Sequence, residues 1–370
     1  MDKKVILAVA GSGKTYHICN NINKEARNVI IAFTNQNIKN IVVELIKKFG
    51  YVPEKTLVMT FHSFIYNFMI RPFDNFIGSF YGKNAFSSNG VSILPPPLPS
   101  IKVGDNLYKK NKDYSAVNSL EHFIDKNDRY YSDYLSKLIL KVKDKNNSLL
   151  KEACKNVNKF FDCILVDEMQ DFREENWELL TKIIENVNNI TLVGDYNQHS
   201  VSGLNNHGTP FSKNNSYEEY KSYLSSIGLI VDETSLIKSR RCSEEVCNFI
   251  KERLAINIES TKLNDGHIIW LDNADRQKIE QVLRNDKIVK LVLEKPEIYN
   301  FNAISWSYSK GDTYEETCVI LTDKYSKLNE NDFSLPSSVI SVNKLYVALT
   351  RSKGNVYIIK KDTFNSIYKT

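Results

Sequence analysis

The stretch Val5-Ile6-Leu7-Ala8-Val9-Ala10-Gly11-Ser12-Gly13-Lys14-Thr15 decides the fold of this chain. It begins with an apolar run, passes through a loop of small residues and ends on a lysine and a hydroxyl residue. Glycines let backbone N–H groups turn inward around phosphate oxygens, and the N-terminus of a following helix adds partial positive charge. The pattern predicts a phosphate-binding loop between a strand and a helix, with Ala8 in place of the usual first glycine.

The residues of this loop have separate expected tasks. We expect Lys14 to reach the β- and γ-phosphates of ATP and Thr15 to hold Mg²⁺. The backbone that surrounds the phosphates is expected to come from Ala10, Gly11, Ser12 and Gly13.

The composition is that of an ordinary globular protein. A length of 370 residues predicts two or three domains, and 42% hydrophobic with 25% charged residues argues against a disordered chain. The formal net charge of +5 permits a polyanionic partner. We see no secretion signal and no apolar run of the roughly 20 residues that span a membrane, and the six cysteines form no Cys-x-x-Cys pair. We therefore expect a cytoplasmic protein with reduced thiols and no membrane partner.

Short apolar runs alternate with longer amphipathic stretches, which is typical of a parallel α/β sheet. The first series predicts strands at 5–9, 29–33, 57–60, 163–166 and 190–193, and helices at 15–25, 38–49 and 174–187. The second series predicts strands at 266–271, 304–306, 318–321 and 356–359, and helices at 244–254, 275–283 and 344–350.

Residues 74–150 interrupt this alternation. They contain Gly, Ser and Asn clusters, a proline run at 95–99 and a lysine-rich helical pattern at 115–143. We therefore expect a first domain at 1–74 and 151–204, a short insertion at 75–150, and a second domain at 205–370.

Two further segments carry polar residues at the ends of predicted strands. In Ile164-Leu165-Val166-Asp167-Glu168 the first carboxylate can hold Mg²⁺, and the second can orient and deprotonate a water. In Leu192-Val193-Gly194-Asp195-Tyr196-Asn197-Gln198 the strand delivers Gln198, which can position the same water or donate to a γ-phosphate.

With these segments in place, the sequence resembles the superfamily 1 helicases of the UvrD/Rep kind over almost its whole length. The strongest matches are Asp-Glu-Met-Gln-Asp at 167–171, which fits D-E-x-Q-D of motif II, and Leu-Tyr-Val-Ala-Leu-Thr-Arg at 345–351, which fits motif VI. The other motifs occur in the family's order, with I at 8–15, Ia at 32–35, Ib at 60–64, III at 194–198, IV at 236–241 and V at 309–313.

The resemblance implies two RecA-like P-loop domains with ATP at their interface. The second domain would supply Arg241 and Arg351 as arginine fingers. The first domain would supply Lys14, Thr15, Asp167, Glu168 and Gln198. Arg240 and Gly311 are expected beside the nucleotide.

The resemblance also implies that single-stranded nucleic acid crosses both domains. Hydroxyl and amide groups suit phosphate contacts, and aromatic rings suit base stacking. The candidates on the first domain are Phe33, Thr34, Asn35, Thr60, Phe61 and His62. For Phe61, a place in the core is an equally good interpretation.

The chain departs from the family at several positions. Motif IV has Arg240 where relatives have a tyrosine that stacks on the base, and Thr313 stands where motif V has a glutamate. Residues 199–203 lack the aromatic residues that stack on DNA, and an upstream glutamine that reads adenine is not found. We therefore expect looser nucleotide choice and weaker contact with bases. Relatives insert a large subdomain between motifs IV and V, where this chain has only 305 − 241 = 64 residues.

These features predict an ATP-dependent translocase or helicase on single-stranded DNA, with 3′-to-5′ polarity by resemblance and RNA as another possible substrate. The alternative is an ATPase subunit that regulates or recruits a partner nuclease, as in anti-phage defence, with little unwinding. A small-molecule kinase would leave motifs Ia, Ib, V and VI without a task.

Overall fold

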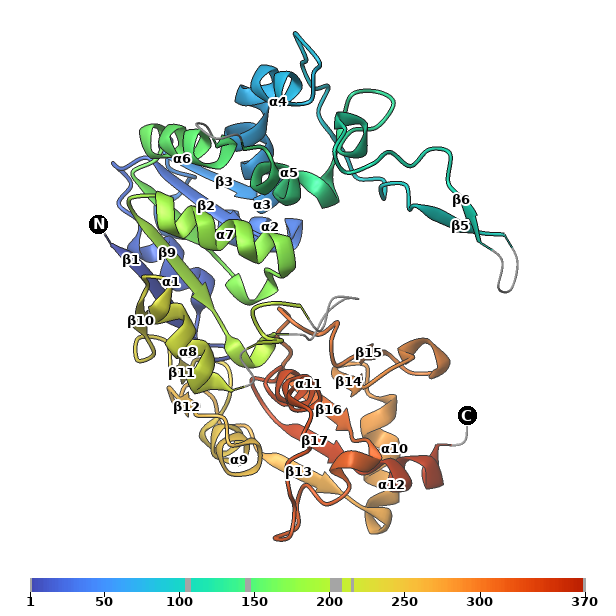
Figure 1. Cartoon of the computed structure of the whole chain (residues 1–370). Helices are drawn as coiled ribbons and strands as arrows, with labels where there is room; N and C mark the ends of the chain where they lie inside the picture. The colour runs from blue at the N-terminus through green and yellow to red at the C-terminus, as the bar shows by residue number, and fades with distance from the viewer. Residues whose placement is uncertain (1, 104–107, 144–147, 200–207, 214–215, 369–370) are drawn as a thin grey trace.

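The computed structural model describes residues 2–103, 108–143, 148–199, 208–213 and 216–368. These residues form two α/β lobes, one above the other in Figure 1, and both parallel sheets predicted from the sequence are present. Within the described residues, no helix is long and apolar enough to cross a membrane.

The first lobe is built on a sheet of six parallel strands in the order β10-β1-β9-β8-β2-β3. The strands are β1 (Lys3–Leu7), β2 (Asn28–Ala32), β3 (Thr56–Thr60), β8 (Cys163–Val166), β9 (Ile190–Gly194) and β10 (Ile230–Asp232). All of β2 is buried, with Val29 and Ile31 in the core on one face and Ile30 and Ala32 in the core on the other. A central strand that is apolar on both faces requires helices on both sides.

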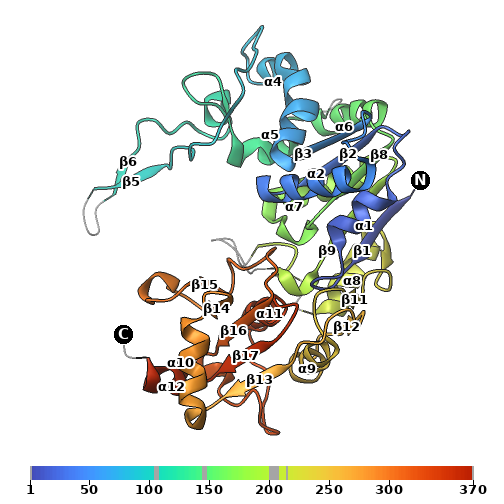
Figure 2. The same cartoon turned by 180° about the vertical axis from the view of Figure 1, so that it is seen from behind.

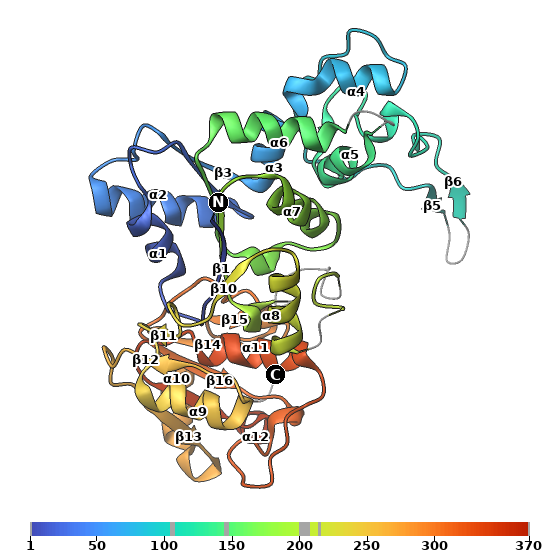
Figure 3. The same cartoon turned by 60° about the vertical axis from the view of Figure 1, so that its left-hand side comes forward.

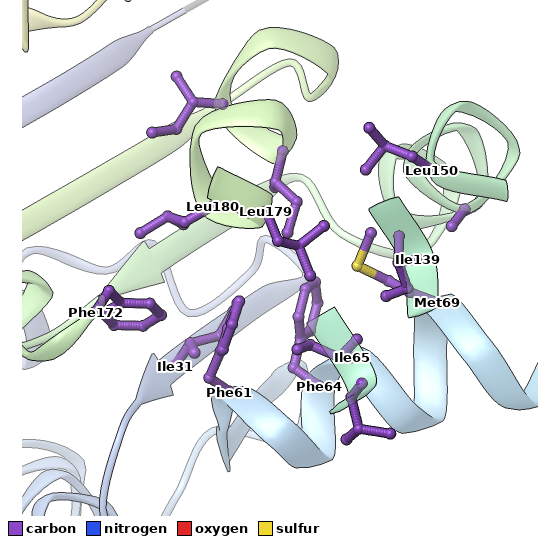
Figure 4. Close-up of a cluster of buried hydrophobic side chains, with 14 of the residues drawn as sticks. Ile31, Phe61, Phe64, Ile65, Met69, Ile139, Leu150, Phe172, Leu179 and Leu180 are labelled. Atoms are coloured by element: carbon purple, nitrogen blue, oxygen red, sulfur yellow. The ribbon is translucent and has the colours of Figure 1, made fainter. Parts of the chain in front are cut away.

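Helices cover both faces of this sheet, as Figure 3 shows. On one face lie α1 (Lys14–Asn21) and α2 (Asn35–Phe49). On the other lie α5 (Leu135–Lys141), α6 (Leu149–Phe160), α7 (Glu174–Asn186) and α8 (Tyr217–Ser226). The core on that second face includes Phe61 and Phe64 of α3 (Phe61–Phe64), packed with Phe172 and Leu179 in Figure 4.

The second lobe has five parallel strands in the order β13-β17-β16-β14-β15. They are β13 (Ile268–Leu271), β14 (Ile288–Val292), β15 (Ala303–Ser305), β16 (Glu316–Ile320) and β17 (Val356–Ile359). One face packs on α9 (Glu244–Leu254) and α11 (Val339–Leu349), and the other on α10 (Arg276–Arg284) and α12 (Lys361–Ile367).

The insertion contains less helix than its sequence pattern predicts. Within 115–143 the one α-helix is α5, and the prediction of helix before it is wrong. Asp125 explains part of the difference, because its carboxylate accepts from the backbone N–H groups of Asn127 and Arg129 and so stabilises a turn. The rest comprises α4 (Asp74–Phe80), the pair β4 (Val91–Ser92) and β7 (Tyr130–Tyr131), and a hairpin of β5 (Ser100–Lys102) and β6 (Tyr108–Lys110). This hairpin projects away from both lobes in Figures 1 and 2.

The predicted domain boundary at 204–205 lies outside the described residues. The first sheet continues past it, because α8 packs on this sheet and β10 pairs with β1. We therefore propose that the second lobe begins after Asp232, with the small parallel pair β11 (Lys238–Ser239) and β12 (Glu259–Ser260).

Candidate functional site

The loop that follows β1 has the backbone that a phosphate cradle needs. Gly11 and Gly13 have φ values of 71° and 87°, a region that glycine enters without a steric penalty. Gly13 is also the N-cap residue of α1, which begins at Lys14. The start of the helix therefore faces the same space as the loop, and Lys14 is only 8% exposed.

The end of β8 brings two carboxylates to this loop. Thr15 Oγ1 donates to Asp167 Oδ2 at 2.8 Å, and Lys14 Nζ lies 3.5 Å from Glu168 Oε1. Burial raises the pKa of Asp167, and the charge of Glu168 raises it further. Burial also acts to raise the pKa of Glu168, but Lys14 and then Lys310 outweigh it and leave that pKa lowered. The paired hydroxyl and carboxylate of Thr15 and Asp167 are hard oxygen donors, a set that fits Mg²⁺.

A chain of hydrogen bonds joins Glu168 to the end of β9. Gln170 donates through its amide to Glu168 Oε2, and its Oε1 accepts from the backbone N–H of Asp195 at 2.9 Å. The Asp195 carboxylate then accepts from Gln198 Nε2 at 2.8 Å. Through these bonds Asp195 and Gln170 fix Gln198 and Glu168 relative to each other.

Two arginines of the second lobe reach the same space. Arg241 precedes α9, and Arg351 follows α11 and is 1% exposed. Among the described residues, their guanidinium groups donate only to uncharged oxygens. The acceptors are Thr350 O for Arg241, and Val347 O, Ser309 O, Asp312 O and Thr350 Oγ1 for Arg351. Burial lowers the pKa of Arg351 to about 9, with a further contribution from the charge of Arg241.

These groups line one cleft of about 440 Å³ between the lobes. A buried arginine next to a partly buried one is costly when neither bonds a carboxylate, unless an anion joins them. The cleft also contains Lys14, and the carboxylate of Asp167 in the cleft bonds the hydroxyl of Thr15. The arrangement therefore suits a polyphosphate bound with a divalent cation.

The lobes meet directly around this cleft. The backbone N–H of Arg240 donates to Gly11 O at 2.8 Å, and Lys310 pairs with Asp171. At Gly11 a Cβ would lie 2.6 Å from Arg241 Cβ, so the loop needs glycine for this approach as well as for its φ.

Most of the predicted nucleotide-site residues line this cleft. They are Gly11, Gly13, Lys14, Thr15, Asp167, Glu168, Gln198, Arg240, Arg241, Gly311 and Arg351. Ala10 and Ser12 are not among the residues that line the cleft, and their expected backbone contacts with phosphate stay a prediction. The N–H of Ala10 donates to Tyr346 Oη at 2.8 Å, and Ser12 turns inward to bond Val9 O.

The predicted nucleic-acid residues divide into two groups. Phe33 and His62 are partly exposed neighbours with ring centroids 5.4 Å apart, and Thr34, Asn35 and Thr60 are at least partly exposed. Phe61 does not belong with them, because it is 1% exposed and packs on Phe172, with ring centroids 4.7 Å apart. Its interpretation as a core residue is correct.

The hydroxyls of the two threonines also have local partners. Thr34 Oγ1 caps α2 by accepting from Asn37 N, and Thr60 Oγ1 caps α3 by accepting from Ser63 N. Both hydroxyls therefore already have a structural role. Of residues 199–203, the structure describes only His199, which is buried and stacks on Phe211 with centroids 4.0 Å apart.

Sequence reasoning missed several residues around the cleft. Tyr16 lies under the Arg240 guanidinium at 4.8 Å, and Lys310 and Tyr346 connect the lobes. Lys310 and Tyr346 lie inside motifs V and VI, so position within a motif was an available signal. The side chains that α2 contributes to the wall carry no such signal; they are Asn37, Asn40, Val43, Glu44 and Lys47.

Comparisons with known proteins agree with the motifs. Residues 2–204 match the AAA domain family, and residues 118–360 match the viral superfamily 1 RNA helicase core domain. The chain is 28% identical over 234 residues to a protein of Mycoplasma genitalium described as "Probable DNA helicase II homolog". That alignment covers 52% of this chain and 33% of the relative, so the chain spans about a third of the relative's length.

Solved helicase structures are also similar to this chain. The arterivirus nonstructural protein 10 helicase matches with a TM-score of 0.45 and 12% identity, covering 99% of this chain and 62% of that one. The PRRSV helicase gives 0.44 and 12%, with 97% and 52% covered. These scores are low, so the fold assignment depends on the strand orders given above. With two RecA-like parallel sheets and both family matches, the chain belongs to the superfamily 1 helicases.

Proposed function

We propose that this chain is an ATP-driven motor that moves along single-stranded DNA. The observation that carries the proposal is the cleft where Lys14 and Glu168 of one lobe meet Arg241 and Arg351 of the other. A site split between two lobes makes hydrolysis depend on how the lobes are placed, which is what a motor requires.

Each group has a proposed task in hydrolysis. Lys14 and the two arginines stabilise the negative charge that develops on the transferring phosphoryl group. Glu168 accepts the proton of the attacking water, which Gln198 orients. Thr15 and Asp167 would hold Mg²⁺, which supplies charge neutralisation at the phosphates.

The proposed DNA path crosses the first lobe near Phe33 and His62. Phe33 directly precedes Thr34, the N-cap residue of α2, and α2 also lines the nucleotide cleft. A shift of this helix on closure would change both sites together. The preference for DNA and the 3′-to-5′ direction are supported by the family alone.

Strand-separation assays test this function. The substrates are a 20-base-pair and a 60-base-pair duplex, each with a 3′ tail, a 5′ tail or no tail, and matched RNA versions. We expect ATP-dependent opening of the short 3′-tailed DNA, and little opening of the long duplex because the segment between Arg241 and Ser305 is short. Opening from the 5′ tail alone would contradict the polarity, and opening of RNA alone would contradict the substrate.

A further inference from the structure

Tyr346 lies where the two lobes and the nucleotide loop meet. It is in the last turn of α11 and fully buried, five residues before Arg351. Its hydroxyl has two partners, and both belong to the first lobe. It accepts from the backbone N–H of Ala10 at 2.8 Å and donates to Asp195 Oδ2 at 3.2 Å.

The two partners of this hydroxyl connect it to both groups of residues proposed for hydrolysis, those that act on the water and the loop that holds the phosphates. Asp195 Oδ2 also accepts from Gln198 Nε2 at 2.8 Å, so one oxygen orients the glutamine and receives the tyrosine. The backbone N–H of Asp195 continues through Gln170 to Glu168. On the other side, Ala10 belongs to the loop that precedes Lys14. A single hydroxyl thus connects the helix that leads to Arg351 with the phosphate loop, with Gln198 and with Glu168, the proposed proton acceptor.

The hydroxyl stays a donor under all ordinary conditions. Burial raises the pKa of Tyr346 well above its usual value, and the charge of Asp195 acts in the same direction. Burial also raises the pKa of Asp195, although Lys14 and the bond from Gln198 oppose this. A buried hydrogen bond to a carboxylate fixes geometry more firmly than one at the surface.

We infer that Tyr346 is a positioning residue, whose hydroxyl aligns Gln198 and the phosphate loop with Arg351 only when the lobes are closed. This inference rests on the proposed function. In this inference the Tyr346 hydroxyl makes turnover, rather than ATP binding, depend on closure of the lobes. When the lobes separate, Asp195 Oδ2 keeps only the bond from Gln198 of its two bonds among the described residues, and Gln198 is held less tightly.

The variant that tests this is Tyr346→Phe, which keeps the ring and removes the hydroxyl. The matched control is Tyr325→Phe, since Tyr325 is also buried in the second lobe and its hydroxyl has no hydrogen-bond partner among the described residues. ATP turnover is measured with and without oligo(dT), together with KM and the melting temperature. We expect kcat with oligo(dT) to fall by about tenfold in Tyr346→Phe, which loses both hydrogen bonds of the hydroxyl; a tenfold fall corresponds to about 1.4 kcal/mol. KM should stay within about twofold.

A double-mutant cycle separates positioning from packing. If Tyr346 acts through Gln198, the double variant Tyr346→Phe with Gln198→Ala should be little slower than Gln198→Ala alone. Additive losses, or a Tyr346→Phe variant as active as Tyr325→Phe, would overturn the inference. If oligo(dT) fails to stimulate the unchanged protein, the proposed motor function fails. A tenfold loss of unstimulated kcat at constant KM would then still support the positioning role.

Discussion

At the scale of single residues, charge is concentrated at the cleft and divided between the lobes. The first lobe brings Lys14 beside Glu168, and the second brings two arginines that bond only uncharged oxygens among the described residues. A buried Arg351 beside a partly buried Arg241, neither bonded to a carboxylate, is expected at a site for an anion. Neither lobe alone therefore has the complete set of groups proposed for hydrolysis.

Arg351→Ala should reduce turnover far more than nucleotide affinity, because the charge matters most in the transition state. Arginine fingers contribute roughly 10³–10⁵ in rate, and we expect a loss near 10³ because Arg241 shares the task. The control is Arg253→Ala, since Arg253 lies on α9 and donates to Glu330 O away from the cleft. Steady-state kinetics give both kcat and KM. Normal kcat with a raised KM would assign Arg351 to ground-state binding instead.

Lys14→Ala should abolish detectable hydrolysis and weaken ATP binding. It removes the cation expected next to the phosphates and leaves the partly buried Glu168 without its 3.5 Å partner. Binding of a fluorescent ATP analogue and phosphate release report the two effects separately. The control Lys47→Ala removes a lysine from the outer wall of the same cleft, where it pairs with Glu44, and should retain most activity. Equal activity in both variants would show that the loop does not hold the reacting phosphates.

At the scale of elements, the site depends on how closely the phosphate loop approaches the segment before α9. Gly11 permits this approach, since a Cβ would lie 2.6 Å from Arg241 Cβ and 2.7 Å from Ser239 Oγ. Gly11→Ala should therefore displace Arg241 and lower ATP turnover by at least tenfold. Gly50→Ala is the control, because Gly50 also has positive φ but open space around it.

Both variants carry the cost of a left-handed backbone, about 1 kcal/mol, which thermal unfolding measures. Only Gly11→Ala should also lose activity. Equal turnover in the two variants would mean that contact between the lobes at Gly11 has no part in catalysis.

The sequence allowed prediction of most elements that position the site, because apolar runs at strand positions end on polar residues. The prediction failed where a strand lacked a clear apolar run. β14 was missed because Lys290 lies in its centre, yet this lysine is fully buried and donates to Asn285 O at 2.8 Å. β10 was missed because Ile230 and its neighbours are an edge strand of three residues with partial exposure. The role of Tyr346 could not be predicted, because it depends on the contact between lobes.

At the scale of the whole molecule, few of the rings on the proposed DNA path are free to stack on bases. Phe61 is in the core and His199 is covered by Phe211, which leaves Phe33 and His62 partly exposed. Phosphate contacts should therefore dominate binding of single strands, and such contacts weaken as salt displaces counterions. We expect the affinity for oligo(dT) to fall by at least about tenfold between 50 and 200 mM NaCl, as measured by fluorescence anisotropy. Binding that does not change with salt would indicate stacking instead.

We propose that nucleic acid controls ATP hydrolysis in the cleft between the two lobes. The most direct measurement is the rate of ATP turnover as oligo(dT) is titrated into the unchanged protein and into Glu168→Gln. We expect a saturable rise in the unchanged protein and no turnover in Glu168→Gln, which should still bind ATP because only the proton acceptor is lost. Turnover that ignores oligo(dT), or that persists in Glu168→Gln at the unchanged rate, would contradict this proposal.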